Sequence, residues 1–188
     1  MPNTCDFSVR IACIGWGSLI PEPGNLPCLT GWEADGPELP VEFARESEDG
    51  RLTLVLVRGA RPSTTLWCQL ASDTMDGAVR ALQQRERTPS DRSIGRWPDV
   101  TGQYPFGSEV GQWAEKHKLD GVVWTALKPG FRANRDEPAT LAGAVAHLRG
   151  LDGPALAKAA RYIRQAPAQI RTEFRAALES ELDRLGCA

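Results

Sequence analysis

An apolar stretch near the start of the chain, Ile11 to Leu19, ends in two closely spaced glycines. Its first part, residues 11–14, has the length and character of a buried strand. Gly15 and Gly17 then let the backbone turn sharply, and a turn of this kind can direct N–H groups toward a ligand. The sequence therefore predicts a strand that leads into a ligand-binding glycine turn, with the alternative that the two glycines only end a core strand.

The glycine pair differs from the dinucleotide-binding fingerprint. That fingerprint needs a third glycine three residues after the second, and then a helix that receives the pyrophosphate. Here the third position is Ile20, and Pro21 and Pro23 follow, which favour extended or turn backbone over a helix interior. A nicotinamide-dependent oxidoreductase is therefore disfavoured.

Length and charge narrow the class of protein further. The 188 residues fit one domain, 1–188, with a sizeable core. Lys and Arg number 22 against 24 Asp and Glu, and the basic residues are scattered among acidic ones, so no nucleic-acid partner is expected. No window of about 18 apolar residues occurs, and residues 1–6 lack a basic flank followed by an apolar segment. We therefore expect no membrane partner and a cytoplasmic location.

Cysteine and histidine usage argues against a metal site. The five cysteines are odd in number and show no CxxC spacing, so we expect free, mostly buried thiols; they are Cys5, Cys13, Cys28, Cys68 and Cys187. The two histidines, His117 and His147, have no cysteine at ligand spacing, which disfavours zinc. Acid/base chemistry is expected to fall to carboxylates rather than to a Ser-His or Cys-His pair.

Three apolar runs with short turns between them, residues 39–45, 52–57 and 65–70, predict an antiparallel meander. Asp49-Gly50 is a hairpin signal between the first two runs. A last strand is expected at 120–127 and helices at 108–119, 141–148, 152–163 and from about 167 onward. Residues 88–106 are expected to form a long ordered loop with docked aromatic side chains.

Glu86 is the candidate general acid/base. Ser72 or Asp73 can cap a helix whose apolar stripe is Met75, Val79 and Leu82. The next position of that stripe is Glu86, where partial burial would raise the carboxyl pKa toward neutrality and suit it to exchange a proton. The alternatives are that Arg85 or Arg87 pairs with Glu86, or that Glu86 lies in water. Glu109, in the first turn of the next helix, suits the helix dipole and is a weaker candidate.

Several of these segments together resemble the gamma-glutamylcyclotransferase-like superfamily. Gly15-Trp16-Gly17-Ser18-Leu19 is similar to the Tyr-Gly-Ser-Leu type of motif that opens this family. Phe43-Ala44-Arg45-Glu46-Ser47 is similar to its Phe/Tyr-x-Arg-x-Ser strand, and Leu82-Gln83-Gln84-Arg85-Glu86 to its Leu-x-x-Arg-Glu helix end. The resemblance covers residues 9–127 loosely, and the helices expected at about 138–186 lie outside it.

The resemblance implies an α+β fold in which a small mixed or antiparallel sheet curves into a barrel-like body with packed helices. It also implies an enzyme that converts a gamma-glutamyl amide or peptide into 5-oxoproline and an amine, without a cofactor or metal. Glu86 would be its acid/base. The small-molecule gamma-glutamyl substrate would be bound by Gly15, Trp16, Gly17, Ser18 and Leu19, together with Arg45.

Two departures from the family pattern bear on the substrate. Trp16 stands where Tyr is usual, so an N–H that only donates replaces a hydroxyl. Arg87-Thr88-Pro89 replaces the Gly-Tyr turn that usually follows the glutamate. The alternative function is a non-catalytic module that binds an acidic small molecule or peptide end through the glycine turn and Arg45. The leaving amine and the oligomeric state are left open.

Overall fold

The computed structural model describes residues 9–99, 101–132 and 138–187. It divides into two compact units, each described by itself below. The first contains the chain up to Gly15, Pro23–Pro37 and Thr65–Ala126, and the second contains Trp16–Glu22, Glu38–Thr64 and the chain from Leu127 onward. The single domain expected from chain length, with its core at 9–127, stays a prediction.

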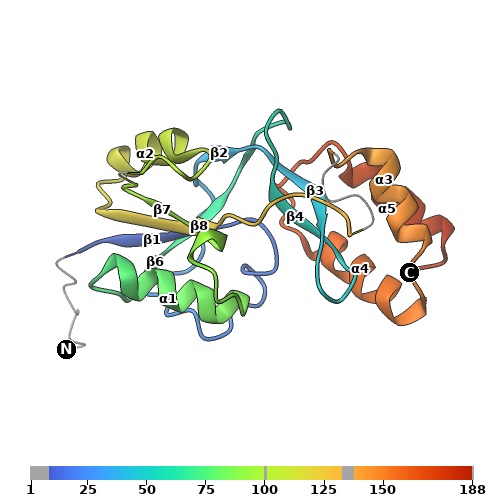
Figure 1. Ribbon diagram of the computed structural model, residues 1–188, viewed down its shortest axis with the longest axis horizontal. Helices are drawn as coiled ribbons and strands as arrows, with labels where there is room; N and C mark the ends of the chain where they lie inside the picture. The colour runs from blue at the N-terminus through green and yellow to red at the C-terminus, as the bar shows by residue number, and fades with distance from the viewer. Residues whose placement is uncertain (1–8, 100, 133–137, 188) are drawn as a thin grey trace. The chain divides into compact units, whose positions relative to one another are not determined.

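The first unit is built on a four-stranded mixed sheet in the order β6-β1-β8-β7 (Figure 1). Strand β1 pairs antiparallel with β6 and parallel with β8, and β7 pairs antiparallel with β8. All five residues of β1 are buried, as a central strand covered on both faces requires. The strands are β1 Ile11–Gly15, β6 Leu66–Leu70, β7 Ile94–Trp97 and β8 Gly121–Thr125.

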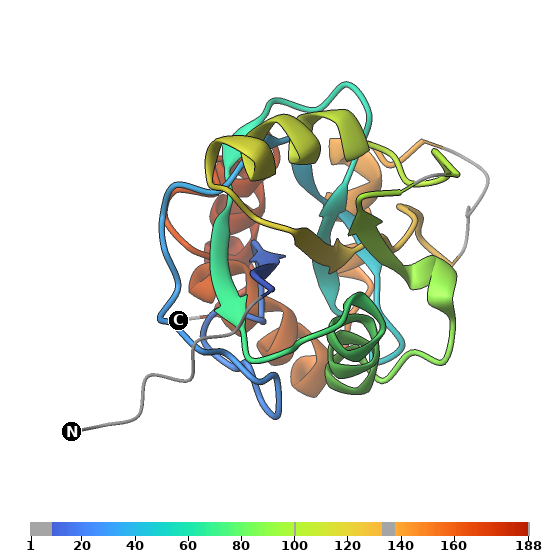
Figure 2. The same cartoon turned by 90° about the vertical axis from the view of Figure 1, so that its left-hand side faces the viewer.

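Two helices, α1 (Met75–Glu86) and α2 (Gly107–Lys116), cover opposite faces of this sheet (Figures 1 and 2). Close packing on β7 depends on Gly95, which pairs with Trp124 in the register of β7 and β8. A Cβ at position 95 would overlap the Trp124 indole, which is fully buried. Glycine therefore allows the largest core side chain to lie beneath the backbone of β7.

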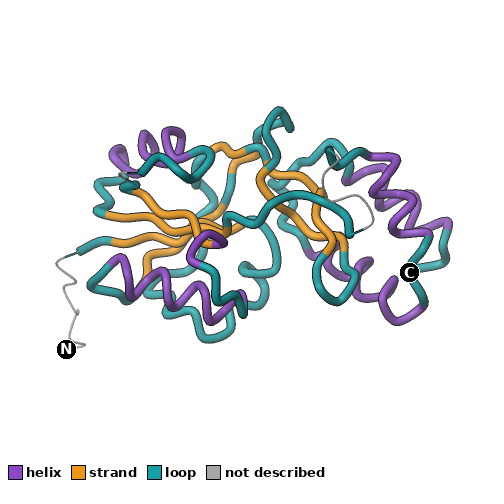
Figure 3. The backbone as a smooth tube through the Cα atoms, in the orientation of Figure 1, coloured by secondary structure: helices purple, strands orange, loops and turns teal. Residues whose placement is uncertain are grey.

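The second unit contains an antiparallel hairpin, β3 (Val41–Glu46) with β4 (Leu52–Leu56), and a short pair, β2 (Glu38–Leu39) with β5 (Ser63–Thr64). Helices α3 (Leu141–Arg149) and α4 (Gly153–Gln165) pack on β4, and α5 (Arg175–Arg184) packs on both of them (Figure 3). Asp152 caps α4, its side chain accepting a hydrogen bond from the N–H of Ala155 at 3.0 Å.

A buried carboxylate anchors the segment before α5. Glu42 of β3 is 3% exposed, and its Oε2 accepts hydrogen bonds from the N–H groups of Glu173 and Phe174 at 2.9 and 3.2 Å. Its Oε1 accepts from the N–H of Phe43 at 2.8 Å. Burial raises the pKa of this carboxyl, and hydrogen bonds, including these three, oppose the rise. Glu42 therefore has a structural role, because both of its carboxylate oxygens accept hydrogen bonds from backbone N–H groups.

The meander prediction is wrong in its third strand. Strands β3 and β4 pair as predicted, but β6 pairs with β1 in the other unit's sheet. Four of its five residues are buried, so β6 needs a partner strand and cover on both faces. The sequence predicted β4 as that partner because β4 is the preceding apolar run. In the structure β6 pairs with β1, which is far away in the sequence, and this pairing buries β6.

Three other expectations are corrected. Residues 88–106 are not one loop, since they include a short 3-10 turn at Asp91–Ser93 and strand β7. The helix predicted from about residue 167 begins only at Arg175. Thr74, rather than Ser72 or Asp73, caps α1, its side chain accepting from the N–H of Gly77 at 3.1 Å.

The fold is α+β, as expected. No sheet among the described residues closes into a barrel. Free thiols are observed for Cys13, Cys28, Cys68 and Cys187, and Cys5 lies outside the described residues. None of the described helices combines the length and the hydropathy that a bilayer-spanning segment requires.

Candidate functional site

Glu86, in the first unit, is the last residue of α1. The predicted helical stripe is observed, because Val79 and Leu82 are buried and Glu86 follows them on the same face. Only 16% of the Glu86 side chain is exposed. The carboxylate therefore lies against the protein body and not in bulk water, which excludes one of the alternatives considered for it.

The other alternative is partly realised, because Arg85 pairs with Glu86. Its Nη1 lies 2.8 Å from Glu86 Oε1, and 13% of the Arg85 side chain is exposed. Burial raises the pKa of Glu86 above its usual value, while the charge and hydrogen bond of Arg85 lower it, and the net shift is upward. Glu86 thus combines a raised carboxyl pKa with a neighbouring cation, a combination that suits a group that gains and loses a proton.

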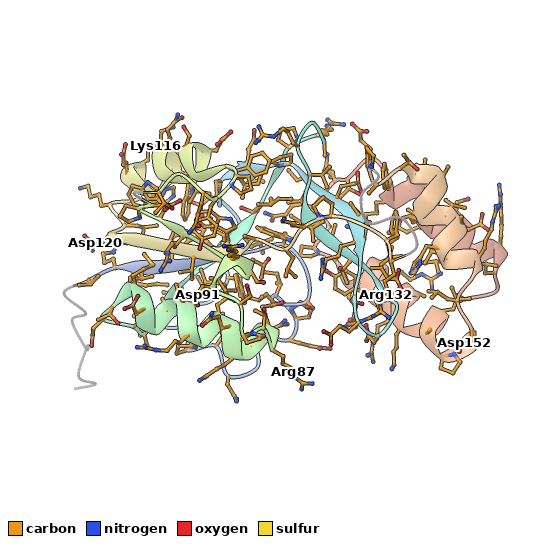
Figure 4. All side chains as sticks on the ribbon, viewed as in Figure 1. Arg87, Asp91, Lys116, Asp120, Arg132 and Asp152 are labelled. Carbon is orange, nitrogen blue, oxygen red and sulfur yellow. The ribbon has the colours of Figure 1, made fainter. Side chains whose placement is uncertain are left out.

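The end of α1 holds Glu86 in place. Arg87, labelled in Figure 4, adopts the left-handed conformation with φ 53°. Its N–H bonds to the carbonyl of Gln84 at 3.3 Å, and the N–H of Thr88 bonds to that of Gln83 at 3.0 Å. This is the Schellman arrangement, whose left-handed position is usually a glycine.

Three cysteines of the first unit lie close to one another, and one of them, Cys13, interacts electrostatically with Glu86. Cys13 of β1 is fully buried, and burial raises its thiol pKa, with smaller contributions from Cys28 and from the charge of Glu86. Cys13 is opposite Cys68 in the β1–β6 register, and the Sγ atoms of Cys68 and Cys28 are 3.3 Å apart. Among the described residues, no group of three or more His, Cys, Asp or Glu side chains is arranged to hold a metal ion.

The glycine turn runs from the end of β1 into the second unit. Gly15 ends β1, and the carbonyls of Gly17 and Ser18 accept hydrogen bonds from the N–H groups of Ile20 and Glu22, both at 3.0 Å. These two bonds form a helix-like turn. The first N–H groups of such a turn have no carbonyl partner within the turn itself.

The side chains of the turn are mostly used inside the protein. Trp16 is 4% exposed, and its indole Nε1 donates to the carbonyl of Leu54 at 3.3 Å. Leu19 is 5% exposed. A ligand at the turn would therefore contact its backbone rather than the side chains of Trp16 and Leu19.

A pocket in the second unit lies against this turn. Its walls include Gly17 and Ser18 from the turn, Arg51 just before β4, and Lys158, Arg161 and Tyr162 from α4. None of these four side chains, Arg51, Lys158, Arg161 and Tyr162, was among the site residues predicted from the sequence. The helical spacing of positions 158, 161, 162 and 165 could have indicated that these residues share one face of α4.

Arg45 is not among the residues that line this pocket. Its Nη1 donates to the carbonyl of Lys128 at 2.8 Å, which links β3 to the segment after β8. Of the predicted substrate-binding residues, Gly17 and Ser18 therefore line the pocket next to α4, and Arg45 does not.

His117 has the structural environment of a packing residue. Its ring stacks at a tilt on Trp113, with centroids 4.6 Å apart, and its Nε2 lies 3.3 Å from Asp35 Oδ2.

The sequence matches no protein-family model, and no curated protein matches it.

Proposed function

We propose that this protein is a gamma-glutamyl cyclotransferase-type enzyme that releases 5-oxoproline and an amine from a gamma-glutamyl amide or peptide. The observation that carries the proposal is Glu86, a largely buried carboxylate with a raised pKa at the end of α1. This is the position to which the resemblance assigns the acid/base glutamate.

Two further observations support the resemblance. The family usually has glycine after the glutamate, and Arg87 here adopts the left-handed conformation that glycine prefers. The family also continues into a further strand, and β7 follows in this chain at Ile94–Trp97. The barrel-like curvature expected for the family remains part of the proposal.

In the proposed reaction Glu86 moves one proton. The neutral α-amino nitrogen of the substrate attacks the γ-carbonyl carbon, and Glu86 accepts the proton that this nitrogen loses. The bond between the carbonyl carbon and the leaving nitrogen then breaks, and Glu86 returns the proton to the departing amine. The products are 5-oxoproline and the free amine, and no water is consumed.

The glycine turn would bind the glutamyl part of the substrate. Backbone N–H groups around Gly17, Ser18 and Leu19 would bind it and the oxyanion that forms during attack. A well-aimed donor of this kind lowers a barrier by about 3 kcal/mol. Because the Trp16 side chain is buried and its Nε1 already donates to the carbonyl of Leu54, we assign substrate binding at this position to the backbone.

The test is product formation from a panel of gamma-glutamyl amines and dipeptides, with 5-oxoproline as the readout. Glu86→Gln is expected to abolish turnover, because an amide cannot accept and return the proton. Glu109→Gln is the matched control, since it removes the same charge from an exposed residue of α2. Full activity in Glu86→Gln would remove this residue from the mechanism.

The second candidate function is a binding module without catalysis, which the pairing of Glu86 with Arg85 favours. It predicts that ligands raise the melting temperature by mass action and that no 5-oxoproline forms from any member of the panel.

A further inference from the structure

The pocket beside the glycine turn carries excess positive charge. Arg51, Lys158 and Arg161 line it together with one acidic residue, Glu22, and Asp49 lies outside the lining but pairs with Arg51. The chain as a whole has a formal net charge of -2. A local concentration of cations on an acidic protein attracts anions to that position.

Lys158 and Arg161 are available to a ligand. Both are exposed residues of α4, and none of the ion pairs between described residues includes either of them. They are three positions apart, so they lie on the same side of the helix, next to Tyr162.

Arg51 is held in position by two contacts. Its Nε lies 2.9 Å from Asp49 Oδ2, and its guanidinium carbon lies 5.7 Å from the centre of the Tyr162 ring. A cation over an aromatic face is attracted to it. Tyr162 in turn packs edge-to-face on Phe43, with ring centroids 6.3 Å apart. Arg51 is thus held in one position before a ligand binds, whereas the exposed side chains of Lys158 and Arg161 can adjust to the ligand.

We propose that this pocket binds the anionic group, a carboxylate or a phosphate, of a small ligand. Lys158 and Arg161 neutralise the charge, Arg51 presents a fixed guanidinium, and Ser18 and the backbone at Gly17 form the opposite wall. The cavity is about 20 Å³, which is room for one small group, so the rest of the ligand extends beyond it. The inference extends the proposed function, because the same turn would hold the glutamyl part, but it concerns binding alone.

Calorimetric titration of the full chain at low ionic strength tests the proposal, with inorganic phosphate and glutarate as probes. We expect at least one to bind, and the preferred probe to identify the anion class. The double variant Lys158→Gln/Arg161→Gln should weaken binding by about tenfold or more, since it removes two charge-assisted contacts. The charge-matched control Arg92→Gln/Lys116→Gln changes two exposed residues of the first unit and should bind as the wild type does.

Amide NMR spectra of the full chain show where the anion binds. Binding should shift the Gly17 and Ser18 signals in the wild type, and these shifts should be lost in the pocket variant. Equal weakening in both double variants would show a general charge effect and overturn the proposal. Absence of binding of both probes at millimolar concentrations would also overturn it. Binding without 5-oxoproline formation would contradict the proposed function alone, and turnover without anion binding would contradict this inference alone.

Discussion

The phenol of Tyr162 occupies the space that a side chain at Gly17 would fill. The same hydroxyl accepts a hydrogen bond from the N–H of Leu54 at 3.2 Å. Helix α4 therefore covers the glycine turn through a side chain that is held by β4. In this unit glycine is required at position 17 by packing as well as by the turn.

Gly17→Ala should lower the free energy of unfolding by about 1–3 kcal/mol, because its methyl group would displace Tyr162. Urea denaturation measures this loss. Tyr162→Phe removes the obstructing oxygen, so the double variant Gly17→Ala/Tyr162→Phe should be more stable than the sum of the two single effects predicts. Gly153→Ala in α4 is the control, since a Cβ there meets no atom within 4 Å. Strictly additive effects would show that residues 17 and 162 do not interfere.

The raised pKa of Glu86 predicts a specific pH dependence of stability. The native state binds a proton at this group more tightly than the unfolded state, whose pKa is near 4.5. The contribution of Glu86 to stability is therefore full below that value and is lost as pH rises through the raised native pKa. Each unit by which the native pKa of Glu86 exceeds its unfolded pKa corresponds to about 1.4 kcal/mol in the free energy of unfolding.

Denaturation of the wild type and of Glu86→Gln across this pH range measures the effect. The wild type should lose stability relative to the variant as pH rises, and Glu109→Gln serves as the charge-matched reference. A wild type that instead gains stability relative to Glu86→Gln with rising pH would mean that the Arg85 pair outweighs burial.

Arg87→Gly should stabilise the protein by up to about 1 kcal/mol. A residue with a Cβ in the left-handed conformation costs roughly 1–2 kcal/mol, and glycine avoids this cost but loses more entropy on folding. Thermal denaturation by circular dichroism measures the change. Arg87→Ala keeps the Cβ and should show no such gain. If glycine and alanine act alike, position 87 does not adopt the left-handed conformation in solution.

Oxidation should join Cys28 and Cys68. Their Sγ atoms are 3.3 Å apart, and a disulfide requires about 2.05 Å, so a small approach is enough. With hydrogen peroxide, the half-buried Cys28 would form a sulfenic acid and release water. The sulfur of Cys68 would then displace a second water to form the disulfide, with loss of two hydrogen atoms from the protein.

Peptide mapping by mass spectrometry identifies the linked pair. Cys28→Ser and Cys68→Ser should each abolish the link, and Cys13→Ser should retain it. A disulfide that maps to any other pair, or no change in mass under mild peroxide, would contradict the prediction.

Local patterns were sufficient for elements whose partners lie nearby in the sequence. The stripe at Met75, Val79 and Leu82 predicted α1 and the inward position of Glu86, because helical periodicity depends on residues only a few positions apart. The hairpin of β3 and β4 was predictable from Asp49-Gly50 for the same reason. Strand β7 was missed because its four residues include Gly95 and Arg96, which give no strand pattern.

The glycine turn at 15–17 was determined by the sequence itself, as were the buried strand before it and the largely buried position of Glu86 at the end of α1. Only the tertiary structure decided that β6 pairs with β1, that Cys28 meets Cys68, and that Arg51, Lys158 and Tyr162 surround Gly17. Long-range partners are selected by burial and shape over the whole unit, and the spacing of residues along one segment does not carry that information.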